Sequence, residues 1–244
     1  MSRRSKNNLQ GIILLIILLT LLAVVLFRYK APTDKTREPA YSLEVLKPFT
    51  FSNDTDLKEW EEKVFKGKVI YKVEKAGEES YVKASSDNAA SALYYKIKMD
   101  AKSSYPMVSW KWRAEKFPVK VNKESLETEN EDDFAARVYV IFPALFFTNS
   151  KVLEYVWAES LPVGSTGVSP YSENIKLMVL ESGAKNEWKL EDRDIRADYV
   201  KMFGREPEHN IGAVAFMTNA EHTNSSADAV YDEIKLGYRG GGGK

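Results

Sequence analysis

Apolar and polar side chains alternate with a period of two over most of the chain beyond Phe49. Such runs are typical of strands with one buried and one exposed face, and clusters of Gly, Asn, Asp, Ser and Pro separate them here. The alternating or apolar runs cover residues 69–73, 93–97, 108–112, 134–142, 153–158, 175–181, 212–218 and 230–236. About nine or ten strands without long helices between them predict a mainly β fold, an antiparallel two-sheet β-sandwich of the jelly-roll type.

One segment has the period of a helix instead. In DRDIRADYVKMFGREP, residues 192–207, apolar side chains recur at four-residue steps, which predicts one short helix. The repeating positions are Ile195, Tyr199 and Phe203. Asp192 or Asp194 is suited to cap its start, and Gly204 is suited to end it.

The N-terminal part of the chain has a different pattern. Residues 11–27, GIILLIILLTLLAVVLF, are apolar except for one threonine, and at about 1.5 Å per residue they nearly span a hydrocarbon core of roughly 30 Å. The exit LFRYKAPT lacks the small residues of a cleavage site, so we expect an uncleaved signal anchor with the following domain outside the cytoplasm. The predicted parts are a basic cytoplasmic tail (1–8), a single transmembrane helix (9–29), a proline-containing tether (30–48), the β-sandwich domain (49–238) and a flexible glycine-rich tail (239–244).

Composition excludes several classes of function. Lys and Arg together number 35, as do Asp and Glu, so the formal net charge is zero and no overall field attracts nucleic acid. The chain has no cysteine, which excludes disulfides, thiolate nucleophiles, iron–sulfur clusters and cysteine-bound zinc. Only His209 and His222 can supply imidazole, and their polar surroundings favour exposed loop positions for both.

The tryptophan pair in VSWKWR has two alternative interpretations, a sugar platform or part of the core. Trp110 and Trp112 share a face with Val108, whereas serine, lysine and arginine occupy the opposite face. A ring beside a buried valine seldom faces water, so the pair is predicted to lie in the core. Trp157 shares a strand face with Leu153 and Tyr155, so it is also predicted to be buried.

Arg137 and Tyr139 are candidate ligand-binding residues. In DDFAARVYVIF they lie in mid-strand, on the face opposite to the apolar one. A guanidinium there can form a paired contact with a carboxylate or a phosphate of a ligand. The favoured interpretation is a structural ion pair with Asp133, Asp194 or Asp198, because charged strand residues commonly pair across strands.

The predicted helix adds Arg193, Asp194 and Asp198 as further ligand-binding candidates. They lie near its first turn and its apolar stripe, where half-buried charges must be paired. Either they hold the helix against the sheet, which is the favoured interpretation, or they frame a pocket with Arg137. Paired carboxylates can also act on a glycoside, but their spacing along the chain does not show whether they face each other.

The loop PALFFTNS, residues 143–150, is a candidate interaction surface. Leu145, Phe146 and Phe147 are consecutive, so a regular strand cannot turn all three toward one core. The loop either folds over one end of the sandwich or contacts a partner. Tyr171 is a fourth candidate, as a loop aromatic of the kind that a glycan site would use.

Calcium is the one cofactor for which the sequence has candidates. Residues 122–133 contain six carboxylates, but they lack the glycine and the alternating spacing of an EF-hand, which favours a solvated loop. Asp232 and Glu233 are the alternative, by analogy with the structural calcium ligands of jelly-roll modules. No other cofactor is expected.

Several segments taken together resemble a known family. They are SWKWR at 109–113, DDFAARVYVIF at 132–142, YVW at 155–157, EDRDIRADYVKMFG after Trp188, and AFMTNAEHTNSSADAVYDEI. The chain resembles the bacterial domain-of-unknown-function family 3047 over roughly residues 49–237. The resemblance implies a galactose-binding-like jelly roll with no established activity. With the predicted anchor, it implies a bacterial inner or cytoplasmic membrane, with the bulk of the chain on the periplasmic or extracellular side.

We therefore expect a protein that binds rather than catalyses. The main hypothesis is a single-pass membrane protein whose β-sandwich is an accessory or scaffolding subunit of a membrane complex. An alternative is a carbohydrate or envelope-polymer binding module, an inference from fold alone. A second alternative is a hydrolase acting on glycans.

Overall fold

The computed structural model describes residues 42–53, 55–184 and 187–240. The predicted basic tail, the transmembrane helix and most of the tether lie outside the described residues. Within the described ranges, no helix is both long and apolar enough to cross a membrane. The anchor at residues 9–29 therefore stays a prediction.

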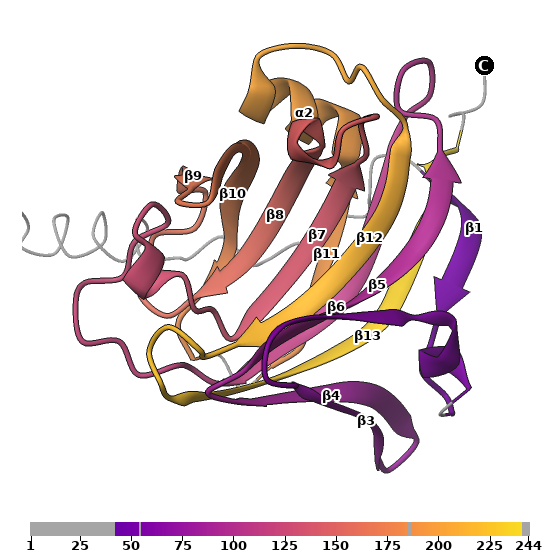
Figure 1. The fold of residues 1–244 in the computed structure, drawn as a ribbon. Helices are drawn as coiled ribbons and strands as arrows, with labels where there is room; N and C mark the ends of the chain where they lie inside the picture. The colour runs from indigo at the N-terminus through magenta and orange to yellow at the C-terminus, as the bar shows by residue number, and fades with distance from the viewer. Residues whose placement is uncertain (1–41, 54, 185–186, 241–244) are drawn as a thin grey trace, which may run out of the picture. The chain divides into compact units, whose positions relative to one another are not determined.

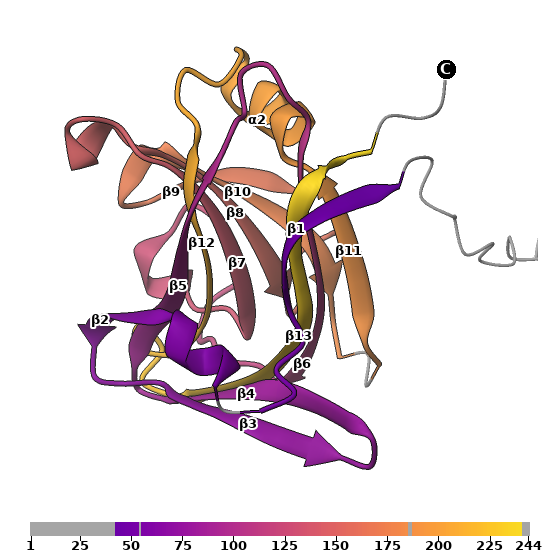
Figure 2. The ribbon, with the colours of Figure 1, turned by 90° about the vertical axis from the view of Figure 1, so that its right-hand side faces the viewer.

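The described residues form two sheets and one α-helix. The six-stranded sheet has the order β11 (Lys189–Asp194), β6 (Pro106–Lys116), β13 (Ser226–Arg239), β4 (Glu79–Asp87) and β3 (Ile70–Ala76), and β1 (Leu43–Phe49) also pairs with β13. The seven-stranded sheet has the order β2 (Glu61–Lys66), β5 (Ala90–Met99), β12 (Ile211–Asn219), β7 (Ala136–Phe142), β8 (Lys151–Ala158), β10 (Ser172–Ser182) and β9 (Thr166–Ser169). Short 3-10 turns are η1 (Asp56–Glu59), η2 (Glu129–Glu131) and η3 (Phe147–Asn149). Figures 1 and 2 show two layers, which confirms a mainly β sandwich.

Strand pairing differs from the prediction in two places. Strand β10 runs parallel to β8, so the prediction of antiparallel pairing is wrong for these two strands. All of strand β1 except Phe49 lies in the predicted tether (30–48), so the fold begins before Phe49. Pro48 is tolerated in β1 because this strand pairs with β13 alone and can leave a ladder position without an N–H donor. Strand β2 was not predicted either. It lies at the edge of its sheet and is exposed throughout, so its sequence has no apolar alternation.

The predicted tryptophan core is confirmed. Trp110, Trp112 and Trp157 are fully buried between the sheets. The ring centroids of Trp110 and Trp112 lie 5.5 Å apart, and those of Trp112 and Trp157 lie 5.6 Å apart. The pair Trp110 and Trp112 therefore joins the two sheets and does not form a ligand platform.

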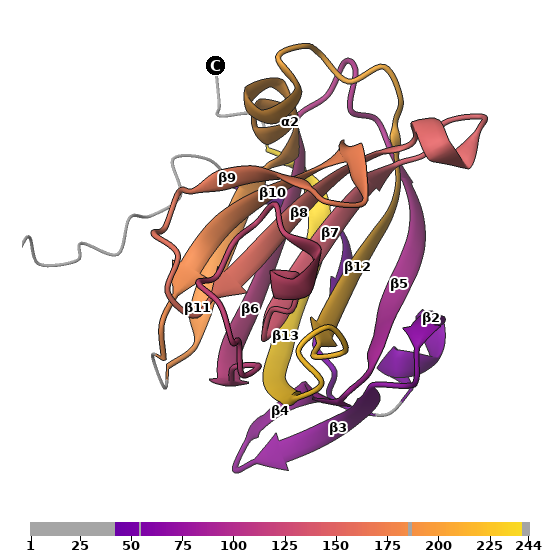
Figure 3. The same cartoon turned by 60° about the vertical axis from the view of Figure 1, so that its left-hand side comes forward.

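A smaller apolar cluster covers part of the seven-stranded sheet from outside. Leu126 and Phe134 come from the connection between β6 and β7, and they pack against Val156, Leu177 and Val179. Figure 3 shows this connection, which includes η2, lying against the outer side of the sheet. It brings the acidic segment that ends at Asp133 next to β7 and β8.

Helix α2 (Ile195–Phe203) confirms the predicted helix and both of its caps. The Asp194 side chain accepts a hydrogen bond from the Ala197 main-chain N–H at 3.0 Å. Gly204 ends the helix with a φ of 70°, a left-handed conformation that glycine adopts without strain. The ring of Tyr199 packs 4.7 Å from that of Phe142, so the helix is fixed to the end of β7.

Candidate functional site

A row of side chains crosses the outward face of the seven-stranded sheet. Tyr94 on β5 is opposite Ala215 on β12, Ala215 is opposite Tyr139 on β7, and Tyr139 is opposite Glu154 on β8. These side chains point outward because their neighbours along each strand, such as Phe216, lie in the main core. Since neighbouring strands lie about 4.8 Å apart, the two tyrosines are roughly 10 Å apart across the alanine. Both tyrosines are half-buried.

Arg137 lies on the same face of β7, two residues before Tyr139. It is 3% exposed and pairs with Asp132, and its Nε lies 2.9 Å from Oε1 of Glu154 without the alignment of a hydrogen bond. The favoured interpretation of an ion pair is confirmed, but the expected partners were wrong. Asp194 lies on β11 of the six-stranded sheet, Asp198 lies on helix α2, and Asp133 is held by different groups.

Burial of Glu154 changes its acidity. Desolvation raises the pKa of this carboxyl group to about 7, and the negative charge of Asp132 acts in the same direction. The positive charge of Arg137 and a hydrogen bond from Tyr139 oppose the rise. Near neutral pH, Glu154 therefore exists in both protonation states.

Asp133 is the centre of a second group of contacts at the end of β12. Its Oδ2 accepts hydrogen bonds from the main-chain N–H and from the hydroxyl of Thr223, both at 2.7 Å. Its Oδ1 accepts one from Nδ2 of Asn219 at 2.8 Å and lies 3.4 Å from Nδ1 of His222. Burial, followed by the nearby charge of Asp133, raises the pKa of Glu221 to about 7.

Asn219 holds this part of the chain in place. Its Oδ1 accepts a hydrogen bond from the Phe134 main-chain N–H at 3.1 Å, and its Nδ2 donates to the Asp132 main-chain oxygen at 2.9 Å. The two main-chain partners determine which end of the amide is oxygen. Asn219 therefore joins the end of β12 to the segment that leads into β7.

His222 contacts Tyr171 across the outward face. The hydroxyl of Tyr171, in the turn between β9 and β10, lies 2.6 Å from Nε2 of His222, in the loop between β12 and β13. In the strand order, β7 and β8 lie between these two elements, so the contact joins the two sides of the face that carries Arg137 and Glu154. The expectation of an exposed His222 was wrong, because the carboxylate of Asp133 and the Tyr171 hydroxyl draw its ring into a half-buried position.

We call Asp132, Asp133, Arg137, Glu154, Glu221 and His222 the outward polar cluster. Arg137 and the nearby Tyr139 were predicted as site residues from the sequence, whereas Glu154 and Glu221 were not. One signal was available for Glu154, which is a single acidic residue between apolar neighbours in the run LEYVWA. Asp133 was considered as an ion-pair partner of Arg137, whereas Asp132 was noted only as part of the acidic loop at residues 122–133.

Arg193, Asp194 and Asp198 lie elsewhere and fix helix α2. Arg193 donates to both carboxylate oxygens of Asp198, at 2.9 and 2.6 Å, and the hydroxyl of Tyr155 donates to Asp198 at 2.7 Å. Tyr155 points into the main core, whereas Arg137 points outward, so these residues do not frame a common pocket. Asp194 caps the helix and also pairs with Arg239.

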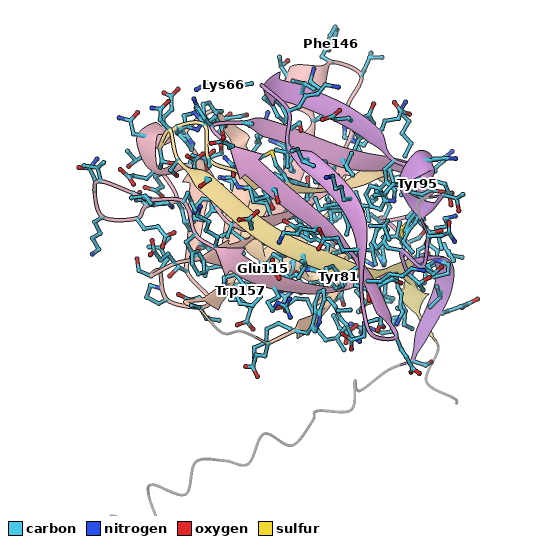
Figure 4. The ribbon with its side chains drawn as sticks, turned by 90° about the horizontal axis from the view of Figure 1, so that it is seen from below. Lys66, Tyr81, Tyr95, Glu115, Phe146 and Trp157 are labelled. Carbon is cyan, nitrogen blue, oxygen red and sulfur yellow. The ribbon has the colours of Figure 1, made fainter. Side chains whose placement is uncertain are left out.

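The 143–150 loop is exposed at its tip. Leu145 is 93% exposed and Phe146 is 68% exposed, and Figure 4 shows Phe146 at the margin of the molecule, pointing away from the strands. Phe147 begins the short turn η3. A shallow cavity of about 440 Å³ lies beside the loop, with Lys151 and Arg205 among its lining residues.

Asp232 and Glu233, the candidate calcium ligands, lie at an irregularity in the pairing of β13 with β6. Glu233 has a φ of 46° and pairs with Lys111 and Lys235, so two lysines already neutralise its charge. Burial raises the pKa of Asp232 to about 6. Within the described parts of the chain, the one group of three or more side chains suited to hold a metal ion is Asp133, Glu221 and His222.

Solved structures with a similar arrangement include proteins that act on or bind glycans. A family 11 carbohydrate-binding module of the cellulosomal cellulase Lic26A-Cel5E of Clostridium thermocellum is 14% identical, with a TM-score of 0.42 over 82% of this chain and 96% of that one. The endoglucanase cel12A from Rhodothermus marinus is 11% identical, with a TM-score of 0.44 over 74% of this chain and 96% of that one. At TM-scores this low, these likenesses decide nothing about the function of this chain.

None of the curated proteins is significantly similar in sequence to this chain. The profile of the family described as "Protein of unknown function (DUF3047)" matches residues 58–235, which is most of the chain and includes every residue of the outward polar cluster. The chain belongs to the DUF3047 family.

Proposed function

We propose that the outward face of the seven-stranded sheet binds carbohydrate. The observation that carries this proposal is the row of Tyr94, Ala215, Tyr139 and Glu154. It places two aromatic side chains on either side of a small residue, with a carboxyl group next to the second ring. Sugars bind to proteins through an apolar ring face, which stacks on aromatic side chains, and through hydroxyl groups, which need polar partners.

Polar groups lie beside the row, of which Arg137 is 3% and Glu154 is 4% exposed. Because the pKa of Glu154 is about 7, its carboxyl group can accept or donate a hydrogen bond near neutral pH. The Arg137 guanidinium, held between Asp132 and Glu154, keeps a fixed orientation on the same face. Tyr171, which is 51% exposed, adds an aromatic ring at the margin of the face.

Calorimetric titration of the purified full-length protein with soluble polysaccharides and oligosaccharides tests the proposal. The panel contains neutral glucans, mannans and galactans, and fragments of bacterial envelope polymers. For any glycan that binds, Tyr139→Ala should weaken binding roughly tenfold or more, which corresponds to about 1.4 kcal/mol. Tyr94→Ala should weaken it as well.

Tyr105→Ala is the matched control, because Tyr105 is 50% exposed and precedes β6 of the other sheet. It should bind as the wild type does. Two results contradict the proposal: no glycan of the panel binds, or one binds with an affinity that Tyr94→Ala and Tyr139→Ala leave unchanged. Release of reducing ends from the bound glycan would instead support the hydrolase alternative.

The accessory-subunit function remains a second candidate because of one observation, the exposure of Leu145 and Phe146 at the tip of a loop. Exposed neighbouring apolar side chains favour a contact with another macromolecule. Native-gel migration of the protein, gently extracted from its own membranes, tests this function. Reproducible migration with the same partners, lost in the double variant Leu145→Ser and Phe146→Ser, is expected; migration alone contradicts it.

A further inference from the structure

Three potential metal ligands lie close together where the C-terminal end of β12 meets the segment that leads into β7. They are Asp133, Glu221 and His222, and one ligand atom from each lies within 4.8 Å of the others. Nδ1 of His222 lies 3.4 Å from Oδ1 of Asp133 and 3.2 Å from Oε1 of Glu221. In a tetrahedral or octahedral ion with bonds of about 2.1 Å, neighbouring ligand atoms are roughly 3.0–3.4 Å apart. The two distances from Nδ1 of His222 fall in this range, and the ligand atoms of Asp133 and Glu221 lie within 4.8 Å of each other.

The second ring nitrogen of His222 has its own partner outside this group. Nε2 lies 2.6 Å from the hydroxyl of Tyr171, which can accept a hydrogen bond from it. A histidine that binds a metal usually donates its other N–H to such a partner, which fixes the ring and leaves a lone pair toward the ion. In that tautomer, the Nδ1 lone pair of His222 faces the two carboxylates, and a cation between them removes the repulsion.

Among the described residues, His222 is the one basic side chain within ion-pair distance of both Asp133 and Glu221. The ammonium of Lys66 reaches the main-chain oxygen of Glu221 rather than its carboxylate. Asn219 donates to Oδ1 of Asp133 and to Oε2 of Glu221, so it orients both groups without neutralising either.

We infer that Asp133, Glu221 and His222 form a binding site for one divalent transition-metal ion, with Tyr171 and Asn219 as the residues that orient the ligands. An imidazole nitrogen with two carboxylate oxygens suits Zn²⁺ or Mn²⁺, whereas Ca²⁺ and Mg²⁺ prefer oxygen ligands alone. The site differs from the calcium pair considered at Asp232 and Glu233. It does not rest on the proposed carbohydrate binding, since a metal ion can bind there whether or not a sugar does.

Zn²⁺ binding to the full-length protein, purified without a polyhistidine tag and treated with a chelator, tests the inference. Zinc is titrated in competition with a chromophoric chelator, and bound metal is counted by mass spectrometry after gel filtration. One Zn²⁺ per chain is expected, and millimolar Ca²⁺ should not displace it. His222→Gln and Glu221→Gln should each weaken binding by at least the roughly tenfold to hundredfold loss that changes beside a metal site cause.

The matched control is His209→Gln, because His209 is the only other histidine in the sequence. It should bind zinc as the wild type does. Asp133→Asn is avoided, since Asp133 also holds the Thr223 loop and its loss can disturb folding. Thermal unfolding of the two variants in chelator should match that of the wild type. The inference is overturned if the wild type binds no zinc, if His222→Gln and Glu221→Gln bind it equally well, or if His209→Gln abolishes binding.

Discussion

The raised pKa of Glu154 predicts a specific dependence of stability on pH. In the folded protein, burial moves this pKa from its ordinary value of 4.5 to about 7. In the unfolded chain the group returns to its ordinary value, so between these two values the folded state binds more protons than the unfolded state. Stability therefore falls as pH rises through this window. A difference of about 2.5 units, at 1.36 kcal/mol per unit, corresponds to about 3 kcal/mol.

Glu154→Gln isolates this contribution because the amide cannot ionise and has nearly the same shape. We expect the variant to be more stable than the wild type above pH 7, and its advantage to shrink by about 3 kcal/mol when pH is lowered to 4.5. Asp132 still pairs with Arg137 in the variant, so the guanidinium keeps one partner. Urea unfolding followed by tryptophan fluorescence at half-unit pH steps measures the free energy of unfolding of both proteins.

Glu173→Gln is the matched control, since Glu173 is an exposed carboxylate on β10 of the same sheet. Its difference from the wild type should change little over the same range. A constant difference between wild type and Glu154→Gln from pH 4.5 to 8 would refute the reasoning, because it would mean that Glu154 keeps its ordinary acidity in the folded protein.

Three further predictions concern stability and are checked by thermal or urea unfolding. Asp198→Asn removes the carboxylate that binds Arg193 and should cost about 3 kcal/mol, since Arg193 is then left half-buried without its partner; a cost near zero would show that the pair does not hold helix α2. Gly237→Ala places a Cβ 2.1 Å from the Glu44 main-chain oxygen, so it should cost about 1–3 kcal/mol and loosen β1; an unchanged midpoint would contradict the pairing of β1. Trp110→Ala should cost about 3–5 kcal/mol, and a small effect would contradict its place in the core.

The sequence predicted elements whose signal is local. The parity of Trp110 and Trp112 along β6 was enough to place them in the core, because a strand alternates its side chains between two faces. The helix at Ile195–Phe203 was recognisable because its apolar repeat, its N-cap and its terminal glycine are all contained in one short segment. Local patterns of this kind do not depend on which strands become neighbours.

The strand order could not be read from the sequence, and the errors follow from this. The parallel pairing of β10 with β8 depends on where the chain returns after β9, which no local pattern encodes. Strand β1 was assigned to a tether because its proline and lysine weaken the alternation, and only its pairing with β13 makes it part of the fold.

The candidate site shows the same limit. Arg137 was identified as a mid-strand charge, but its partner Glu154 lies on the next strand of the sheet, and Asp132 reaches it from the preceding loop. The contact between Tyr171 and His222 joins residues 51 positions apart. Parity can place a side chain on a face, but the register between strands decides what stands beside it.

The cost of burying the outward polar cluster is itself an argument for function. One part of the outward face is covered by an apolar cluster in which Leu126 and Phe134 pack on Val156, a cover that needs no charged groups. The adjacent part buries Arg137 and Glu154, although a buried ion pair commonly contributes less to stability than well-packed apolar side chains of similar volume. Folding alone does not require charges here, because the neighbouring surface of the same sheet is covered without them. A face that keeps costly polar groups, next to aromatic side chains that remain partly exposed, is therefore more readily explained by a ligand than by the stability of the fold.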